Sequence, residues 1–555
     1  MGSHGRAGSA LLRQAAGRIA GASAHGSTAS TATTTAETTA PLRLAAAASR
    51  QQQQQIQGQR FSQLRMISGT PAAAALAPGL NHKDGKVLHP ELLNADVLKT
   101  QYAVRGELYL RAEQLRQQGK EIIFTNVGNP HQLGAKPITF PRQVAALCVA
   151  PFLLDRPDVE QLFPKDAIAR ARKILGSFKG GMGAYSDSRG NLLVRQEVAD
   201  FFTKRDGVPS SPDRIFITDG ASVAVRMMLN AILRDGNDGI LVPIPQYPLY
   251  SASIQLYGGS LVPYALDEDK GWALSTDSIR AAVVKARNEG KHVRGLVFIN
   301  PGNPTGQCLS EDNLKELIKL CYEEKIVLMC DEVYQENVYQ DERPFVSARK
   351  VMHSMGSPYA EGVEMVSFHT VSKGSAGECG LRGGCMELTN IHPGAIDEVY
   401  KCASINLSPN TMGQLALSVM LNPPQPGDES YEQYNSERTA ELASLRRRAH
   451  MVTDGFNSLD GVTCTFTEGA MYAFPRIHLP PKAIAKAKEM GKAPDVYYCL
   501  RLLEATGIST VPGSGFGQAE GTFHLRTTIL PREEVISQFV QKFKDFHEAF
   551  MKEFA

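Results

Sequence analysis

Short apolar runs alternate with amphipathic stretches between about residues 210 and 375. The runs are rich in Val, Ile and Leu on consecutive positions, which is typical of strands buried on both faces of a parallel sheet. The stretches between them repeat apolar residues at helical spacing. The runs lie at 214–220, 238–247, 294–304, 325–334 and 362–373. This alternation predicts an α/β fold with a mostly parallel sheet.

The pattern changes after about residue 400. A long helical pattern covers 438–459, and strand-like segments follow at "GVTCTF", "GAMYAFPRI" and 523–530. The last helical pattern, 531–554, gathers Val, Ile and Phe side chains on one face, which is typical of a helix that packs on a core. We therefore expect a smaller α+β domain in this part of the chain.

The first residues differ from the rest in composition. Residues 1–70 carry seven Arg, no Lys and one acidic residue, Glu37, and they are rich in Ser, Thr, Ala and Gln. Such a stretch buries too little apolar area to offset its ordering entropy. An Arg-rich, Ser-rich and acid-poor leader is typical of organelle transit peptides. We expect residues 1–66 to be a disordered transit peptide to the mitochondrial matrix. The alternatives are the chloroplast and a tail without an address.

These patterns divide the remaining chain into three parts. We expect residues 85–165 to form an N-terminal arm and part of the small domain. Residues 166–400 are expected to form the large domain, and residues 401–555 the C-terminal small domain.

Composition narrows the possible partners. The chain has 555 residues, and its net charge of +2 argues against a dedicated nucleic-acid binder. It has no run of about 20 apolar residues that would span a membrane. Its nine Cys form no C-x-x-C pair, and its thirteen His form no H-E-x-x-H. We therefore expect small-molecule substrates and no metal, nucleic acid or membrane.

Polar residues gather where the predicted strands end, which is where ligands bind in open α/β sheets. The first run ends in "DGAS", where a helix start offers free N–H groups and the Ser222 hydroxyl to an anion. The later runs end near Tyr247, Asn303, Asp331 with Tyr334, and Lys373.

A Lys and an Asp at the ends of two buried strands are costly, because an unpaired buried charge is disfavoured by roughly several kcal/mol. An ordinary salt bridge is one interpretation. Together, however, the residues match one chemistry: an Asp can keep a pyridine nitrogen protonated, and a Lys can form a Schiff base with pyridoxal phosphate. A helix N-terminus, a hydroxyl and Arg382 could hold the phosphate.

Several motifs in this order resemble the fold type I pyridoxal-phosphate aminotransferases, and within them the alanine aminotransferase subgroup. The resemblance covers about residues 90–555. The motifs are "VGNPHQLG", "GAYSDSRG", "DGAS", "PQYPLYSA", "FINPGNPTG", "DEVYQENVY", "FHTVSKGSAGECGLRGG" and "FHLRTTILP". This resemblance implies a large domain that binds pyridoxal 5′-phosphate.

The resemblance also implies a role for each residue. Lys373 forms the Schiff base, Asp331 pairs with the pyridine nitrogen, and Tyr247 stacks on the ring. Tyr334 and Asn303 bind the phenolic oxygen of the cofactor. The phosphate is held by Ala221, Ser222, Arg382 and a hydroxyl that is either Thr370 or Ser372. Arg526 receives the substrate carboxylate, with Gly128 and Asn303 beside it. Tyr185 reaches the phosphate of a neighbouring subunit, which implies a homodimer with shared active sites.

The implied reaction is a ping-pong transfer of the amino group between L-alanine and 2-oxoglutarate, giving pyruvate and L-glutamate. A glutamate:glyoxylate aminotransferase on the same fold and a non-catalytic pyridoxal-phosphate-binding regulator are the alternatives. A nicotinamide oxidoreductase is disfavoured because no G-x-G-x-x-G follows the first predicted strand.

Overall fold

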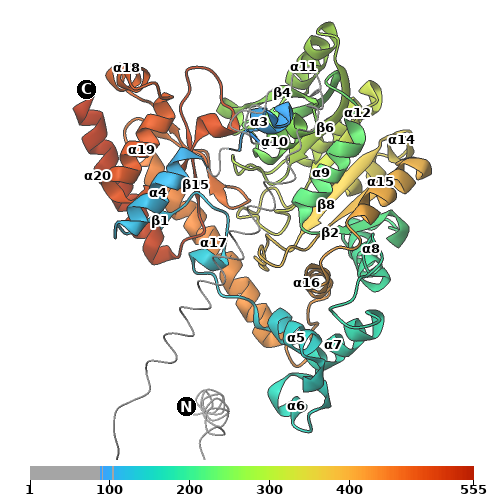
Figure 1. Ribbon diagram of the computed structural model, residues 1–555. Helices are drawn as coiled ribbons and strands as arrows, with labels where there is room; N and C mark the ends of the chain where they lie inside the picture. The colour runs from blue at the N-terminus through green and yellow to red at the C-terminus, as the bar shows by residue number, and fades with distance from the viewer. Residues whose placement is uncertain (1–87, 90–91, 103–105) are drawn as a thin grey trace, which may run out of the picture. The chain divides into compact units, whose positions relative to one another are not determined.

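The computed structural model describes residues 88–89, 92–102 and 106–555. The chain divides into a unit of residues 1–92 and a compact unit of residues 93–555. All helices and strands named below belong to the second unit (Figure 1). The expected transit peptide, residues 1–66, lies outside the described residues.

An eight-stranded mixed sheet forms the centre of this unit, in the order β2-β9-β8-β7-β6-β3-β4-β5 (Figure 1). Its strands are β2 (Ile215–Thr218), β3 (Asp238–Ile244), β4 (Ser260–Asp267), β5 (Ala273–Leu274), β6 (His292–Ile299), β7 (Val327–Asp331), β8 (Met365–Thr370) and β9 (Gly384–Thr389). Neighbours from β8 to β4 are parallel, whereas β9 runs antiparallel to β8 and β2, and β5 runs antiparallel to β4. The mostly parallel sheet expected from the sequence is confirmed.

The pairing brings the carboxyl ends of five strands to one edge. Because β2 and β8 both run antiparallel to β9, they point in the same direction. β7, β6 and β3 share that direction with β8. The residues that follow these five strands therefore meet at one edge of the sheet, where open α/β folds place their ligands.

Helices cover both faces of the sheet. Alternate strand residues such as Phe216, Val242 and Phe368 belong to one apolar cluster, and Leu241, Phe298 and Leu328 belong to another. The helices of this region are α9 (Ala221–Ile232), α10 (Leu249–Leu256), α11 (Thr276–Asn288), α12 (Glu311–Glu324), α13 (Ala348–Ser354), α14 (Tyr359–Gly362) and α15 (Pro393–Ile405). Because alternate strand residues are buried on opposite faces of the sheet, each strand appears in the sequence as a continuous apolar run.

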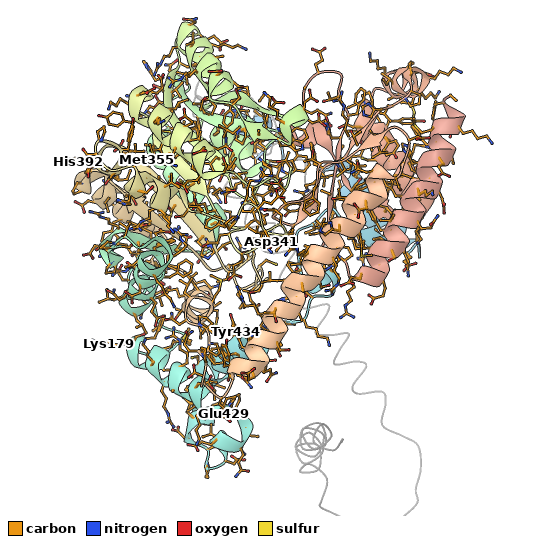
Figure 2. All side chains as sticks on the ribbon, turned by 180° about the vertical axis from the view of Figure 1, so that it is seen from behind. Lys179, Asp341, Met355, His392, Glu429 and Tyr434 are labelled. Atoms are coloured by element: carbon orange, nitrogen blue, oxygen red, sulfur yellow. The ribbon has the colours of Figure 1, made fainter. Side chains whose placement is uncertain are left out.

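A second group of helices packs on the β2–β9 end of the sheet. It comprises α5 (Thr139–Val149), α6 (Val159–Leu162), α7 (Lys165–Ser177), α8 (Leu192–Asp206) and α16 (Thr411–Leu421). Their buried residues form one cluster with Ile215, Ile217 and Cys385 of the sheet. The ring of Phe140 on α5 lies 6.4 Å from that of Tyr434, in the first turns of the long helix α17 (Tyr431–Asn457) (Figure 2).

The later turns of α17 pack on the C-terminal elements. These are β10 (Val462–Thr463), β11 (Tyr472–Ala473), β12 (Arg476–Ile477), α18 (Pro481–Glu489), α19 (Pro494–Thr506), β13 (Ile508–Ser509), β14 (Val511–Pro512), β15 (Leu525–Thr528) and α20 (Glu533–Glu553). The apolar face expected for the last helix is buried, with Phe539 and Phe543 against Phe456 of α17.

Segments from near the start of the described chain join these C-terminal elements. They are α3 (Ala95–Lys99), α4 (Glu107–Gln117) and β1 (Ile123–Phe124). β1 pairs in parallel with β13, so that Ile123 lies opposite Ile508, and α4 packs beside α19 (Figure 1). Within the described ranges, no helix is both long enough and apolar enough to cross a bilayer.

Candidate active site

Asp331 ends strand β7 and is 6% exposed. The Tyr250 hydroxyl donates to its Oδ2 at 2.6 Å, whereas its Oδ1 has no hydrogen-bond partner in the described part of the chain. Burial raises the pKa of Asp331 to about 6, against the opposing effects of the Tyr250 hydrogen bond and the Lys373 charge. A buried carboxylate oxygen without a partner is costly, so this position is suited to a donor on a bound ligand.

Lys373 follows β8 at the same edge of the sheet. Its Nζ donates to the Gly128 carbonyl at 3.4 Å, and its charge helps to lower the pKa of Asp331. A Cβ on Gly128 would lie 2.3 Å from the Tyr472 hydroxyl and 3.3 Å from Lys373 Nζ. Position 128 therefore needs glycine, because any side chain would displace the groups around the lysine.

Arg526 lies on β15 and is 1% exposed. Its Nη1 donates to Asn303 Oδ1 at 3.3 Å and its Nη2 to the Asn126 carbonyl at 2.7 Å. Its Nε has no hydrogen-bond partner, and no carboxylate of the described ranges lies within ion-pair distance of it. A buried guanidinium with a free donor and no counter-charge is suited to a ligand carboxylate.

Tyr334 and Tyr472 together connect the lysine to this arginine, whose guanidinium lies 4.3 Å from the Tyr472 ring centroid. The Tyr334 ring lies 5.4 Å from Lys373 Nζ, and the Tyr334 hydroxyl donates to the Tyr472 hydroxyl at 3.2 Å. Burial raises the pKa of Tyr334 well above its ordinary value. The predicted residues Lys373, Tyr334 and Arg526 thus lie in one connected group.

A second group lies where helix α9 begins. Arg382 Nη2 donates to the Ser222 hydroxyl at 3.2 Å, and a Cβ on Gly220 would lie 2.6 Å from that same nitrogen. The first N–H groups of α9, at Ala221 and Ser222, have no partner inside the helix. Thr370 and Ser372 lie opposite, with their hydroxyl oxygens 3.1 Å apart. N–H groups, a guanidinium and hydroxyls converge here, which is suited to a phosphate.

The last two site residues predicted from the sequence are Tyr247 and Tyr185. The Tyr247 hydroxyl lies 2.9 Å from that of Tyr102, which comes from the segment after α3. Burial raises the pKa of Tyr247 well above its ordinary value, although the Arg526 charge lowers it. Tyr185, in contrast, is 78% exposed. The structure thus gathers the predicted residues at one edge of the sheet, except for Tyr185, which faces solvent.

Three tyrosines of the site were not predicted as site residues. Tyr250 follows Tyr247 by three residues and holds Asp331, Tyr102 contacts Tyr247, and Tyr472 contacts Tyr334 and Arg526. The motif "PQYPLYSA" contained a signal for Tyr250, since residues three apart share a helix face. Nothing local marked Tyr102 or Tyr472, whose positions depend on tertiary packing.

The two unpartnered atoms test whether pyridoxal phosphate fits here. Asp331 Oδ1 needs a donor, which a protonated pyridine nitrogen provides. Arg526 Nε needs an acceptor, which an amino-acid carboxylate provides. Lys373 carries an amine and the start of α9 offers an anion cradle. The donor set therefore fits this cofactor.

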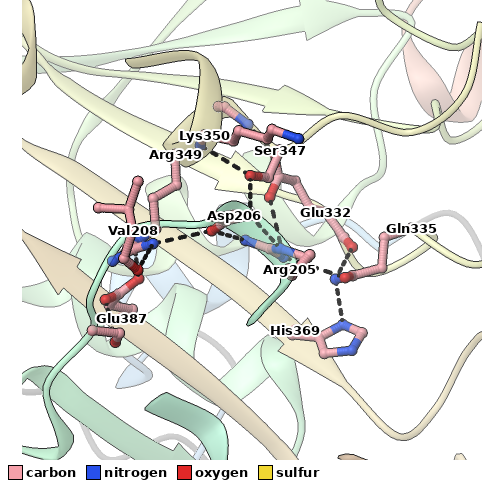
Figure 3. Close-up of polar contacts among 12 residues, drawn as sticks. Arg205, Asp206, Val208, Glu332, Gln335, Ser347, Arg349, Lys350, His369 and Glu387 are labelled. Atoms are coloured by element: carbon pink, nitrogen blue, oxygen red, sulfur yellow. Dashed lines mark hydrogen bonds and ion pairs between the residues drawn. The ribbon is translucent and has the colours of Figure 1, made fainter. Parts of the chain in front are cut away.

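A cluster of charged and polar side chains surrounds Glu332, the residue that follows Asp331 in the chain (Figure 3). We call it the α8–β7 cluster; it contains Arg205, Asp206, Glu332, Gln335, Arg349, His369 and Glu387. Arg205 donates hydrogen bonds to both carboxylate oxygens of Asp206, at 2.7 and 2.8 Å. Arg349 forms ion pairs with Asp206 and with Glu387. Burial raises the pKa of Glu332 to about 7, although the Arg205 charge opposes this. The cluster ties helices α8 and α13 to strands β7 and β9.

Comparisons with known proteins agree with this geometry. A family model described as aminotransferase class I and II matches residues 156–543. The chain is 61% identical over 469 residues to glutamate–glyoxylate aminotransferase 1 of Arabidopsis thaliana, covering 84% of this chain and 98% of that protein. It is 51% identical over 488 residues to a probable mitochondrial alanine aminotransferase of Dictyostelium discoideum, covering 84% and 91%.

A solved alanine aminotransferase from Pyrococcus furiosus has the same fold. Its TM-score is 0.67 at 24% identity, and the match covers 82% of this chain and 100% of that one. The fold expected from the motifs is thereby confirmed as that of the fold type I aminotransferases. With its family model, its relatives and its fold in agreement, the chain belongs to the class I and II aminotransferases.

Proposed function

We propose that this aminotransferase transfers the amino group between L-alanine and 2-oxoglutarate in a ping-pong cycle. Pyridoxal 5′-phosphate is the cofactor expected for the family. The observation that supports the proposal best is the pair of unpartnered atoms, Asp331 Oδ1 and Arg526 Nε, in the group of residues around Lys373. They match a protonated ring nitrogen and an amino-acid carboxylate, and no described residue of the chain supplies either group.

Each residue then has a defined task. Arg526, which donates a hydrogen bond to Asn303, also holds the substrate α-carboxylate. This contact orients the Cα–H bond toward Lys373. The free Lys373 amine takes the Cα proton as general base. Asp331 would keep the ring nitrogen protonated, and Tyr334 would turn its proton from Tyr472 to the phenolic oxygen. When bound, the cofactor supplies the electron sink for the Cα carbanion.

The phosphate would lie at the start of α9. The Thr370 hydroxyl has a single proton, and its 2.7 Å hydrogen bond to the Gly383 carbonyl uses it. Among the described residues the Ser372 hydroxyl has only Thr370 as a side-chain partner, 3.1 Å away, so its proton can turn to a phosphate. We therefore assign the phosphate contact to Ser372, with Thr370 orienting it. Ala221, Ser222 and Arg382 complete the cradle, and Tyr247 stacks on the ring.

The same proposal extends to assembly and location. The exposed Tyr185 is available to a second copy of the chain, which supports a homodimer with shared sites. Relatives from Dictyostelium discoideum and Arabidopsis thaliana are named mitochondrial alanine aminotransferases. Together with the basic leader, this supports delivery to the mitochondrial matrix, with the chloroplast as the alternative.

A second candidate is transfer from glutamate to glyoxylate. It is favoured by the 61% and 60% identity to the two glutamate–glyoxylate aminotransferases of Arabidopsis thaliana, against 51% or less for the alanine aminotransferases compared. Both reactions use one small 2-oxo acid and one five-carbon partner. The acceptor therefore distinguishes them.

The test is a donor and acceptor scan with purified protein lacking the leader. L-alanine is paired with glyoxylate and with 2-oxoglutarate, L-glutamate is paired with pyruvate and with glyoxylate, and kcat/KM is measured for every pair. We expect the alanine/2-oxoglutarate pair to have the highest value. A higher kcat/KM for glutamate with glyoxylate would establish the second candidate, and no transfer with any pair would refute both.

A further inference from the structure

Tyr472 lies between the two positively charged groups of the site. It is the first residue of β11, where it pairs with Thr528 of β15, and it is 3% exposed. Its hydroxyl accepts a hydrogen bond from Tyr334, and its ring faces Arg526. No role follows for it from the motifs, although it contacts more of the site than most predicted residues.

The hydroxyl end of Tyr472 adjoins the lysine. The Tyr472 oxygen and Lys373 Nζ both lie within 3.3 Å of the point where a Gly128 Cβ would stand. The absence of a side chain at Gly128 is what lets the two atoms approach each other. Because the lysine amine carries only donors when charged, a hydroxyl oxygen beside it is a natural acceptor.

The ring end of Tyr472 adjoins the arginine. The Arg526 guanidinium lies 4.3 Å from the Tyr472 ring centroid and 4.8 Å from that of Phe516. Stacking between two rings fixes the plane of the guanidinium. Its N–H groups then point in that plane toward Asn126, Asn303 and the free position at Nε.

We propose that Tyr472 is a dual positioning residue, whose hydroxyl holds the free Lys373 amine and whose ring holds the Arg526 guanidinium. The inference rests on the proposed function, because it assigns Lys373 to the proton transfer and Arg526 to the carboxylate. One side chain would thus set the distance between the base and the carboxylate anchor, and hence where the substrate Cα–H lies.

The electrostatics of the group agree with this geometry. Burial raises the pKa of Tyr472, but the Lys373 and Arg526 charges, with hydrogen bonds from Tyr334 and Lys373, outweigh it. The net effect places its pKa below the ordinary tyrosine value of about 10. The Tyr334 pKa, in contrast, is raised by burial and by Tyr472. Tyr472 is therefore the acceptor of the pair.

Two variants separate the tasks of the hydroxyl and the ring. Tyr472→Phe removes only the hydroxyl, and we expect kcat to fall about tenfold with KM within about twofold, the size of one lost hydrogen bond. Tyr472→Leu also removes the ring, and we expect KM for the amino acid to rise about tenfold further. Tyr498→Phe is the matched control, because Tyr498 is a buried tyrosine of the same region that bonds to His547.

A second readout needs neither substrate nor cofactor. In the apoprotein, ultraviolet difference titration should show one tyrosine that ionises ahead of the ordinary tyrosine transition, because its pKa is lowered. This early ionisation should persist in Tyr498→Phe and disappear in Tyr472→Phe. Unchanged kcat together with an unchanged titration in Tyr472→Phe would overturn the proposal. A wild-type protein that shows the early ionisation but no transfer would instead refute the proposed function alone.

Discussion

Asp331 and Glu332 are neighbours in sequence, are both buried, and both have a raised pKa, yet their surroundings differ. Asp331 faces the candidate site, where one oxygen accepts from Tyr250 and the other has no partner among the residues that the structure describes. Glu332 faces the α8–β7 cluster, where its Oε1 accepts from the Ala348 N–H. Its Oε2 makes no hydrogen bond within the described chain but lies 3.9 Å from the Arg205 guanidinium, an ion partner that Asp331 lacks there (Figure 3). The same strand end thus presents one carboxylate to a ligand and one to the protein.

Two of the buried arginines, Arg349 and Arg526, repeat this contrast. Arg349 pairs with Asp206 and Glu387 and also donates to the Val208 and Pro209 carbonyls. Arg526 has no carboxylate partner in the described chain and keeps a free Nε. Breaking a buried ion pair destabilises the fold, whereas a buried charge without an internal counter-charge is suited to an external ligand. Three experiments test this distinction.

Replacing Lys373 should have the largest effect. Lys373→Ala removes the proposed base, and we expect kcat to fall at least about 10³-fold because general-base catalysis contributes on that scale. The visible colour of the bound cofactor should be lost as well. Lys179→Ala, an exposed lysine (Figure 2), is the control and should retain both. A coloured and fully active Lys373→Ala protein would refute the assignment.

Arginine-to-lysine changes at the two buried positions should separate binding from stability. Arg526→Lys keeps the charge but loses the planar fork, and we expect kcat/KM for amino acids to fall about 10²-fold with little change in Tm. Arg349→Lys breaks internal ion pairs, and we expect a lower Tm with kcat/KM within about twofold. Thermal unfolding and steady-state kinetics of both variants provide the test. Equal effects of the two variants on kcat/KM would remove the distinction.

The smallest effect concerns pH. In the folded apoprotein the pKa of Asp331 is about 6 and that of Glu332 about 7, against ordinary values of 3.8 and 4.5. The folded state therefore binds more protons than the unfolded state between about pH 4 and pH 7, so both carboxyls make stability fall as pH rises through that window. Asp331→Asn and Glu332→Gln should each flatten this fall in Tm.

Addition of pyridoxal phosphate should sharpen the comparison. A protonated ring nitrogen beside Asp331 favours its charged form and should remove the contribution of Asp331 to the fall. The contribution of Glu332 should remain, because its partners lie inside the cluster. If the cofactor removed the contribution of Glu332 instead, the roles given to the two carboxyls would have to be exchanged.

The sequence predicted the strands that carry the site, because their burial on both faces leaves an uninterrupted apolar run. It did not reveal β4, which contains Pro263, a residue that ordinarily argues against a strand. It also missed β9, a short strand that follows directly on a glycine-rich loop. β9 lies antiparallel between β8 and β2, and this pairing between separate segments leaves no local pattern in the sequence.

The site was predicted as far as its residues follow strand ends or family motifs. The residues from β2, β3, β6, β7 and β8 are of this kind, since the strand order alone brings them together. Tyr472 and Tyr102 reach the site from short or irregular segments, and only tertiary packing places them. The α8–β7 cluster was likewise not predicted, because its members come from α8, α13, β8, β9 and the segment after β7, which share no motif.

The parallel pairing of β1 with β13 has a consequence for biosynthesis. Ile123 leaves the ribosome long before its partner Ile508 exists, while the strands of the central sheet are all complete by Thr389. During translation the sheet can therefore form first, because domains fold as their own segments emerge. The region that carries Arg526 can pack only at the end of synthesis. Under the proposed function, the sheet edge with Lys373 and Asp331 would therefore form before the residue that binds the substrate carboxylate is in place.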